Sequence, residues 1–281
     1  RGLMLGPSGS ARQITAAKVE FKKMDDGTYK KTITGEVVNM ADLPSDSIFD
    51  SEFEDEFDEV NNYVSKEVGV FEDDIDAHNA LYGPSKFMRL IHDVQLNKSN
   101  ADISFAAPLS FNAVINKGPV YVRDMFKLYR YENFLYTMQL TGQEIDQYLE
   151  YSFSNWFNTM ENENDHLLRF RKDQNGELLY SERYQSYQLE NSYYNFDAAS
   201  GIKYTVDVSK PQNQKVEIIS LSNNENFYFD STYTVSLNSY RGNGGGGHLI
   251  QGAGLNKSEL TERRLSSTSK DFRYYLMKYI E

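Results

Sequence analysis

The alternation of apolar and polar residues near the start of the chain predicts a β-hairpin. Two alternating runs, Ile14–Phe21 and Tyr29–Val38, flank the dipeptide Asp26-Gly27, which supplies the positive φ angles of a tight turn. A lone hairpin is only marginally stable in water. We therefore expect it to pack on the main body of the protein or to be the remnant of a domain that this chain lacks.

The next segment has the spacing of an amphipathic helix. Its N-cap is expected within Ser45–Ser47 and its end at Gly69. One interpretation is a solvated acidic face with a packed apolar stripe, and the other is a helix that connects two domains. The stripe recurs every three or four positions and consists of Phe49, Phe53, Phe57, Val60 and Val64.

Beyond residue 70, helix and strand patterns alternate without a regular βαβ rhythm, which favours the α+β class. Thr141–Glu144 has the form of a capping box that begins a helix, and residues 158–192 resemble an irregular insertion. Further helices are expected from Ser85 and over Ser269–Ile280. The expected strands are Ala101–Ala107, Tyr129–Leu140, Lys203–Val208, Lys215–Ser220 and Tyr233–Asn238.

The charge is concentrated in one segment. The net charge of the 281 residues is −12, and Asp42–Asp76 alone carries 14 carboxylates and one base, so the remainder sums to about +1. Hydrophobic residues make up 40% and aromatic residues 14% of the chain, which is enough for a sizeable core and excludes wholesale disorder. This charge argues against a nucleic-acid polymer as partner. No apolar run approaches the ~18 residues of a membrane span.

Several common catalytic arrangements are missing from the sequence. The absence of cysteine excludes disulfides, thiolate metal sites and a cysteine nucleophile, and it suits an oxidising compartment. There is no HExxH, HxH or GxSxG motif, and no leader-like segment at Arg1–Met4. No metal site and no catalytic residue is therefore predicted in this chain. The four histidines are His78, His92, His166 and His248.

Two local features are candidates for ligand binding. Asn238–His248 contains four consecutive glycines, which let the backbone approach a ligand closely, although a flexible tight loop is the simpler interpretation. Tyr129–Tyr136 is rich in tyrosine beside Asn133. Exposed tyrosine rings can stack on a planar ring, whereas ordinary aromatic packing is the alternative.

In order and spacing, these pieces resemble the C-terminal, substrate-specificity domain of the 5′-nucleotidase / 2′,3′-cyclic-nucleotide 2′-phosphodiesterase family, closer to the cyclic-phosphodiesterase branch. The resemblance runs from about Val70 to the end of the chain. It implies a layered α/β/β/α fold, here preceded by the β-hairpin and a linker helix. The matching stretches are Tyr82–Ser85, Ala101–Pro108, Lys117–Asp124, Leu128–Asn133, Leu140–Gly142, Leu149–Glu150, Tyr194–Asp197, Gly201–Tyr204, Asp207, Lys210–Pro211 and Asn238–Arg241.

The resemblance also implies a nucleotide site in which two aromatic rings enclose the base. Tyr131 and Tyr240 match those two rings, and Asn133, Gly244 and Gly245 complete the implied site. Two departures put a 5′-nucleotide mode of binding in question. Ala107–Asn112 lacks the arginine-bearing motif of the plain nucleotidases, and Gly246 stands where an aspartate that holds the ribose hydroxyls is usual.

The motifs of the family's N-terminal metallophosphoesterase domain, which would hold two divalent metal ions, are absent from this sequence. We therefore expect a fragment of a periplasmic, secreted or cell-surface phosphohydrolase, inactive alone, whose partners are that missing domain and a nucleotide or nucleoside. Residues 1–40 would be the hairpin remnant of that domain, 41–69 the acidic linker helix and 70–281 the nucleotide-binding domain. The alternative is a non-catalytic binding module for another small molecule or a surface partner.

Overall fold

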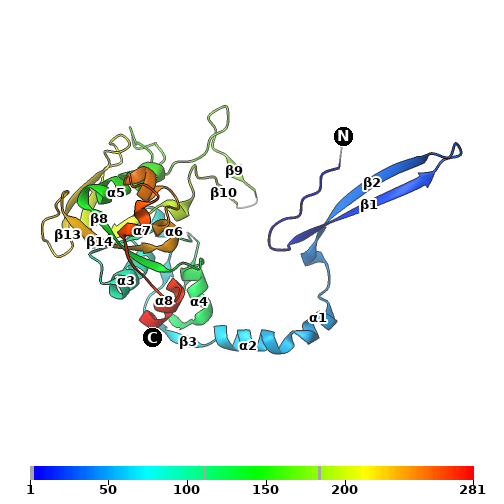
Figure 1. The fold of residues 1–281 in the computed structure, drawn as a ribbon, viewed down its shortest axis with the longest axis horizontal. Coiled ribbons are helices and arrows are strands. Elements are labelled where there is room, and N and C mark those ends of the chain that lie inside the picture. The colour runs from blue at the N-terminus through cyan, green and yellow to red at the C-terminus, as the bar shows by residue number, and fades with distance from the viewer. Residues whose placement is uncertain (1–2, 111, 183–184) are drawn as a thin grey trace. The chain divides into compact units, whose positions relative to one another are not determined.

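The computed structural model describes residues 3–110, 112–182 and 185–281, and the chain divides into two compact units. The first unit is Arg1–Asn62 and the second is Tyr63–Glu281. Within the described residues, no helix has the length and hydropathy of a membrane span. Figure 1 shows the elements of each unit.

The predicted hairpin is confirmed in the first unit. Strands β1 (Gln13–Lys23) and β2 (Tyr29–Asn39) pair in antiparallel register along their whole length. In the turn, Gly27 has a φ of +82°, and the Asp26 carboxylate accepts a hydrogen bond from the Thr28 N–H at 2.9 Å. The local turn chemistry therefore forms this element as expected.

The acidic segment differs from its prediction in three respects. It forms two helices, α1 (Ser47–Glu52) and α2 (Glu54–Val64), instead of one, after a 3-10 turn, η1 (Met40–Asp42). Asp46 caps α1, within the expected range, by accepting from the N–H groups of Ile48 and Phe49. Gly69 does not end the helix but lies in a later strand, β3 (Glu67–Phe71). Phe49, Phe53, Phe57 and Val60 of the apolar stripe are exposed instead of packed, and Val64 is half-buried.

The second unit is built around a five-stranded sheet with the order β11-β5-β14-β8-β15. Strand β5 pairs in parallel with β14, and the other neighbours in the sheet are antiparallel. The strands are β5 (Ile103–Ala106), β8 (Leu135–Thr141), β11 (Ala198–Ser200), β14 (Thr232–Asn238) and β15 (Arg264–Ser267).

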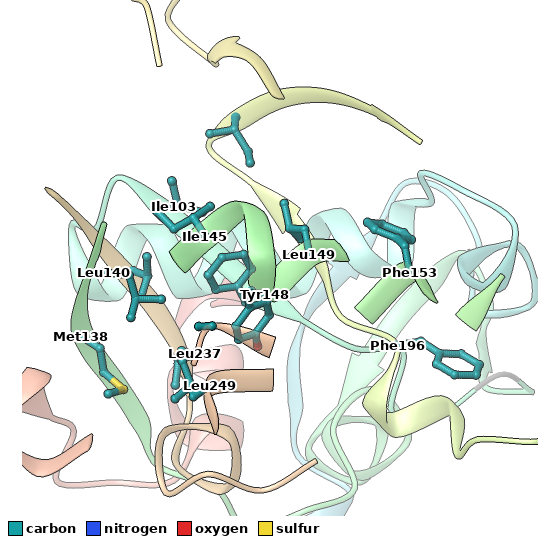
Figure 2. Packing of buried hydrophobic residues seen from close by; sticks show 14 of the residues in the cluster. Ile103, Met138, Leu140, Ile145, Tyr148, Leu149, Phe153, Phe196, Leu237 and Leu249 are labelled. Atoms are coloured by element: carbon teal, nitrogen blue, oxygen red, sulfur yellow. The ribbon is translucent and has the colours of Figure 1, made fainter. Parts of the chain in front are cut away.

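Helices α5 (Gly142–Trp156) and α3 (Lys86–Ser99) pack on this sheet. Side chains alternate along β5, so that Phe105 stacks on Tyr148 of α5 while Ser104 bonds to His92 of α3. The two helices therefore cover opposite faces. Figure 2 shows Tyr148 and other buried residues of the α5 side packed against the sheet.

The contact of α3 with the sheet contains buried polar groups. His92 Nδ1 lies 2.9 Å from Ser104 Oγ, and Gln95 Nε2 donates to the carbonyl of Phe105 at 3.3 Å. Burial lowers the pKa of His92 to about 4, so the ring is neutral near pH 7. A neutral histidine is the form that a buried position without a charged partner favours.

Among its described residues, the second unit also contains four small two-stranded sheets and several short helices, and the expected α+β class is confirmed. The helices are α4 (Val122–Leu128), α6 (Ser239–Gly242), α7 (Glu259–Arg263) and α8 (Phe272–Ile280), with η2 (His78–Leu81), η3 (Tyr193–Asn195) and η4 (His248–Gly252). The strand pairs are β3 with β7 (Gly118–Tyr121), β4 (Ile75–Asp76) with β6 (Val114–Ile115), β9 (Tyr180–Ser181) with β10 (Ser186–Tyr187), and β12 (Ile202–Val206) with β13 (Val216–Leu221).

One strand prediction was wrong in its first half. Strand β8 begins only at Leu135, and residues 129–134 form a loop between α4 and β8. The sequence pattern of this loop is strand-like because it is rich in aromatic residues, of which Tyr129 is buried and Tyr131 and Phe134 are exposed. Their contacts are instead with segments distant in the sequence, such as Tyr129 with Phe272 of α8 at a ring distance of 4.6 Å.

Thr141→Ala is expected to lower the free energy of unfolding by about 0.5–2 kcal/mol. The predicted capping box is confirmed, because Thr141 Oγ1 accepts from the Glu144 N–H at 3.2 Å and Glu144 Oε2 accepts from the Thr141 N–H at 2.7 Å. Urea denaturation measures the loss. Thr205→Ala, which removes an exposed hydroxyl from β12, is the matched control, and an equal loss in both variants would refute the cap's contribution.

Candidate functional site

The two tyrosines that match the base-binding rings lie on loops at the same end of the sheet. Tyr131 precedes β8, and Tyr240 lies in α6 directly after β14. The first residue of β8 pairs with the last residue of β14, so the two loops leave the sheet side by side. Ser239 joins them, since its N–H donates to the Phe134 carbonyl at 2.8 Å and its Oγ accepts from the Phe134 N–H at 3.1 Å.

Both rings are partly exposed. The exposed fraction is 39% for Tyr131 and 45% for Tyr240. The rings of Tyr131 and Tyr194 pack edge to face, with their centres 6.3 Å apart. Partial burial raises the pKa of Tyr131, the phenols of Tyr193, Tyr194 and Tyr240 add to this shift, and Arg130 opposes it. Tyr240 is thus one of the electrostatic neighbours of the Tyr131 hydroxyl.

The glycine loop supports the Tyr240 ring. A Cβ atom at Gly245 would lie 2.5 Å from the ring of Tyr240, so the ring rests directly on the backbone there. Gly244 has a φ of +90°, a conformation that favours glycine. Asn133, also expected at the site, is half-buried, and its Nδ2 donates to the Tyr129 hydroxyl at 3.4 Å.

A buried arginine joins the two sides of the site. Arg241 forms a two-pronged ion pair with Asp197, with Nη2–Oδ1 and Nε–Oδ2 distances of 2.7 and 3.0 Å. The same guanidinium donates to the carbonyls of Gly245 at 2.7 Å and Tyr194 at 3.2 Å. The Gly245 backbone packs against the Tyr240 ring, and Tyr194 contacts Tyr131. The Arg241 side chain therefore positions the residues that support both candidate rings.

A buried, neutral histidine packs against the glycine loop. His248 is fully buried against the rings of Tyr148 and Tyr151, and its Nδ1 lies 3.2 Å from the Gly246 carbonyl. Burial and the nearby Arg241 lower the pKa of His248 to about 4, with Asp197 opposing them. Its Nε2 has no hydrogen-bond partner among the described residues.

The described residues do not supply a metal site. Within them, no three His, Asp or Glu side chains gather closely enough to hold a metal ion. Arg241, Asp197 and His248 are all buried, so these groups support the loops and do not face a ligand. What the arrangement provides is two partly exposed aromatic rings held by a buried polar network, which suits binding of a flat ligand.

The sequence pattern did not single out the whole segment Tyr193–Asp197 as part of this site. Its last four residues were recognised only as a family-like stretch. The structure brings it against Tyr131 through Tyr194 and against Arg241 through Asp197. The available signal was the clustering of tyrosine, asparagine and aspartate in one short segment that follows a long polar insertion.

Solved structures share this fold. A Staphylococcus aureus protein assigned as a candidate 5′-nucleotidase matches with a TM-score of 0.65 and 19% identity, over 95% of this chain and 47% of its own. A 5′-nucleotidase precursor from Thermus thermophilus matches with a TM-score of 0.57 and 20% identity, over 96% of this chain and 46% of its own.

Curated relatives resemble the chain in sequence. A 2′,3′-cyclic-nucleotide 2′-phosphodiesterase/3′-nucleotidase of Salmonella typhimurium is 23% identical over 86% of this chain, and a trifunctional nucleotide phosphoesterase of Bacillus subtilis is 27% identical over 72%. The matches span 39% and 15% of those relatives' lengths. Residues 66–252, more than half of the chain, match the sequence model of the 5′-nucleotidase C-terminal domain. The chain therefore belongs to the 5′-nucleotidase C-terminal domain family.

Proposed function

We propose that the second unit binds a nucleotide by stacking its base between Tyr131 and Tyr240. The observation that supports this most is the placement of two half-exposed tyrosine rings on loops that leave the same end of the β8–β14 pair. A tyrosine ring stacks on any base, because every base has a π face. The site is accordingly expected to tolerate different bases.

In the full protein, this unit would recognise the substrate of a metal-dependent phosphoesterase that acts in nucleotide catabolism. The names of the relatives support this role, since they are nucleotide phosphodiesterases, phosphoesterases and nucleotidases. Two divalent metal ions would lie in a separate metallophosphoesterase domain, in a periplasmic, secreted or cell-surface enzyme. The present chain alone is expected to bind nucleotides without hydrolysing them.

The first unit would belong to the connection with that domain. Its hairpin exposes Val19 and Ile33, which are paired across the two strands. Phe49 and Phe57 of α1 and α2 are also more than half exposed. Exposed apolar side chains in register on one hairpin favour packing against a further domain.

A non-catalytic binding module is the second candidate. The observation that favours it is the crowding at Gly246, where a Cβ atom would lie 2.0 Å from Arg241 Nη1. Gly246 has no side chain to hold the ribose hydroxyls, and one introduced there would clash with the buried Arg241 guanidinium. A surface partner or another small ring, such as a carbohydrate, would then occupy the two tyrosines.

Tyr131→Ala and Tyr240→Ala are each expected to weaken adenosine binding by about 1–3 kcal/mol, which is roughly 5- to 150-fold. The reason is the loss of one stacking face, and isothermal titration calorimetry measures it. Tyr279→Ala, which removes a similarly exposed ring from α8, is the control and should bind like the unaltered protein.

The titrations also separate the two candidates. A chain that binds no nucleoside or nucleotide up to millimolar concentration would overturn the proposal. Binding of a sugar or peptide that depends on both tyrosines, without nucleotide binding, would favour the binding module. Adenosine affinity that is equal in all three alanine variants would show that the base lies elsewhere.

A further inference from the structure

A groove of about 790 Å³ follows the β11 edge of the five-stranded sheet. It is lined by β11, by the first half of α3, by the last residues of α5 and by the β12–β13 pair. Neither Tyr131 nor Tyr240 is among the residues that line it. Its volume is within the range of small-molecule sites, roughly 300–1,000 Å³, so the groove is a candidate for a second ligand.

One end of the groove is apolar. Trp156, near the end of α5, lines it together with Leu167 and Val208. Two backbone hydrogen bonds bring these residues together, since the Asn158 N–H donates to the Leu167 carbonyl at 2.8 Å and the Met160 N–H donates to the Val208 carbonyl at 2.9 Å. The side chains at this end offer a ligand mainly hydrocarbon surface.

The other end of the groove is polar. Helix α3 begins near the apolar end, because Trp156 Nε1 donates at 3.1 Å to the carbonyl of Leu81, which precedes the helix. Further along α3, His92 lies with its Nδ1 2.9 Å from Ser104 Oγ. Ser104 pairs with Ser200 of β11, and both His92 and Ser200 line the groove. The groove therefore becomes polar where α3 passes β11.

The polar end carries a net positive charge. Arg89 and Asp93, on either side of His92 in α3, also line the groove, and their charges offset one another at an Nε–Oδ2 distance of 3.5 Å. Lys203 of β12 lines the same end, and its ammonium donates to the carboxamide oxygen of Asn224, which is neutral. Since His92 is neutral near pH 7, these groups sum to +1. Such an end is complementary to a ligand with one negative charge.

The edge of β11 is poorly suited to pairing with a peptide strand. The strand has three residues, and the alternation of an antiparallel pair directs the backbone groups of only the middle one, Ala199, away from β5. The Ala199 N–H already donates to the Tyr204 hydroxyl at 3.1 Å. A hydrocarbon chain, in contrast, needs no hydrogen-bond partner along the groove.

We propose that this groove binds a medium-chain fatty acid, with the alkyl chain against Trp156 and the carboxylate beside Lys203. The five positions from Lys203 to Val208 span at most about 17 Å of extended chain. An eleven-carbon chain extends about 13 Å, from bonds of about 1.5 Å at tetrahedral angles, so undecanoate fits this length. Because Ser104 occupies Nδ1 of His92, Nε2 is the ring nitrogen that remains for the head group. This site goes beyond the proposed function and does not depend on it.

The fluorescence of Trp156 reports binding directly, because the chain contains one tryptophan. Bromine quenches indole fluorescence on contact, so ω-bromoundecanoate should quench strongly and α-bromoundecanoate weakly at equal occupancy. Unlabelled undecanoate should reverse the quenching. Undecanol, which has the same chain without the charge, is expected to compete about 10-fold more weakly.

Two variants separate the two ends of the groove. Lys203→Glu should weaken undecanoate binding about 10-fold or more and leave undecanol unchanged. Lys257→Glu, which makes the same change in net charge at an exposed position outside the groove, should bind both like the unaltered chain. Val208→Thr should weaken both ligands about fourfold, the effect of one buried methyl group. Circular dichroism verifies the folding of each variant, and the ligand comparison on the unaltered chain decides the proposal without them.

Several results would overturn the proposal. They are an absence of quenching at millimolar undecanoate analogues, equal quenching by the two bromo isomers, and equal affinity for undecanoate and undecanol. An apolar peptide that binds the groove where undecanoate does not would assign the groove to a protein partner and also overturn it. Loss of undecanoate binding in Tyr131→Ala and Tyr240→Ala would place the ligand at those rings instead. Adenosine binding is measured separately, so the failure of either proposal leaves the other standing.

Discussion

Arg241→Met is expected to lower the free energy of unfolding by about 3–5 kcal/mol, because it leaves a buried carboxylate without its partner. Arg241 and Asp197 expose only 1% and 4% of their side chains. The ion pair depresses the pKa of Asp197 against the opposing effect of burial. The substitution also removes the hydrogen bonds to the Gly245 and Tyr194 carbonyls. Urea denaturation measures the stability loss.

Two controls identify the cause of that loss. Lys86→Met breaks an ion pair with Asp73 in which both side chains are more than half exposed, and a loss of at most about 1 kcal/mol is expected. Replacing both members of the buried pair, Arg241→Met with Asp197→Leu, should recover part of the stability because no charge is left unpaired. A single variant as stable as Lys86→Met would contradict the importance of the pair.

The elements that the sequence predicted well are those with local causes. The hairpin follows from its Asp26-Gly27 turn, and α3 begins where Ser85 was expected to cap it, with Ser85 Oγ accepting from the Met88 N–H at 3.1 Å. These signals lie within a few residues of each other. Their geometry does not depend on the rest of the fold.

The elements that the sequence did not predict depend on contacts between distant segments. All four residues of strand β15 are exposed. They show no alternation of apolar and polar residues that would indicate a strand, yet β15 pairs with β8. Helix α4 has seven residues, too few for a clear helical period. The parallel pairing of β5 with β14 joins residues more than 130 positions apart. Propensity and periodicity carry no information on such pairings.

The same distinction applies to the candidate site. Tyr131 and Tyr240 were selected through family-like motifs, and the register of β8 with β14 accounts for their common end of the sheet. Arg241 gains its role only from the tertiary structure. It is placed by its bonds to Asp197 and to the Gly245 carbonyl. Neither bond has a sequence signature that motif comparison detects.

Stability is expected to fall steeply as the pH is lowered from about 6.5 to about 4. His92 and His248 have pKa values lowered from 6.5 to about 4 by burial, so the unfolded chain binds their protons at a higher pH than the folded chain does. Their contribution is therefore complete above pH 6.5 and lost by about pH 4. A shift of this size corresponds to about 3 kcal/mol for each ring.

One carboxyl group opposes this trend. Burial and the neighbouring Glu150 raise the pKa of Asp146 to about 6, so its protonation stabilises the folded state as the pH falls below that value. Asp146 lies on the half-exposed side of α5, where solvent reduces its effect. The two fully buried histidines are therefore expected to determine the sign of the slope.

The double variant His92→Asn with His248→Asn tests this assignment. Asparagine keeps a hydrogen-bonding group near the position of Nδ1, toward Ser104 and Gly246, but does not titrate. Urea denaturation between pH 4 and 7.5 should then give a slope of stability against pH that is much flatter than in the unaltered chain, whatever the absolute stability of the variant. His166→Asn, which replaces an exposed ring, should keep the original slope. A double variant that loses stability with falling pH as steeply as the unaltered chain would assign the acid sensitivity to the carboxylates instead, with Asp197 and its bond to Arg241 as the first group to examine.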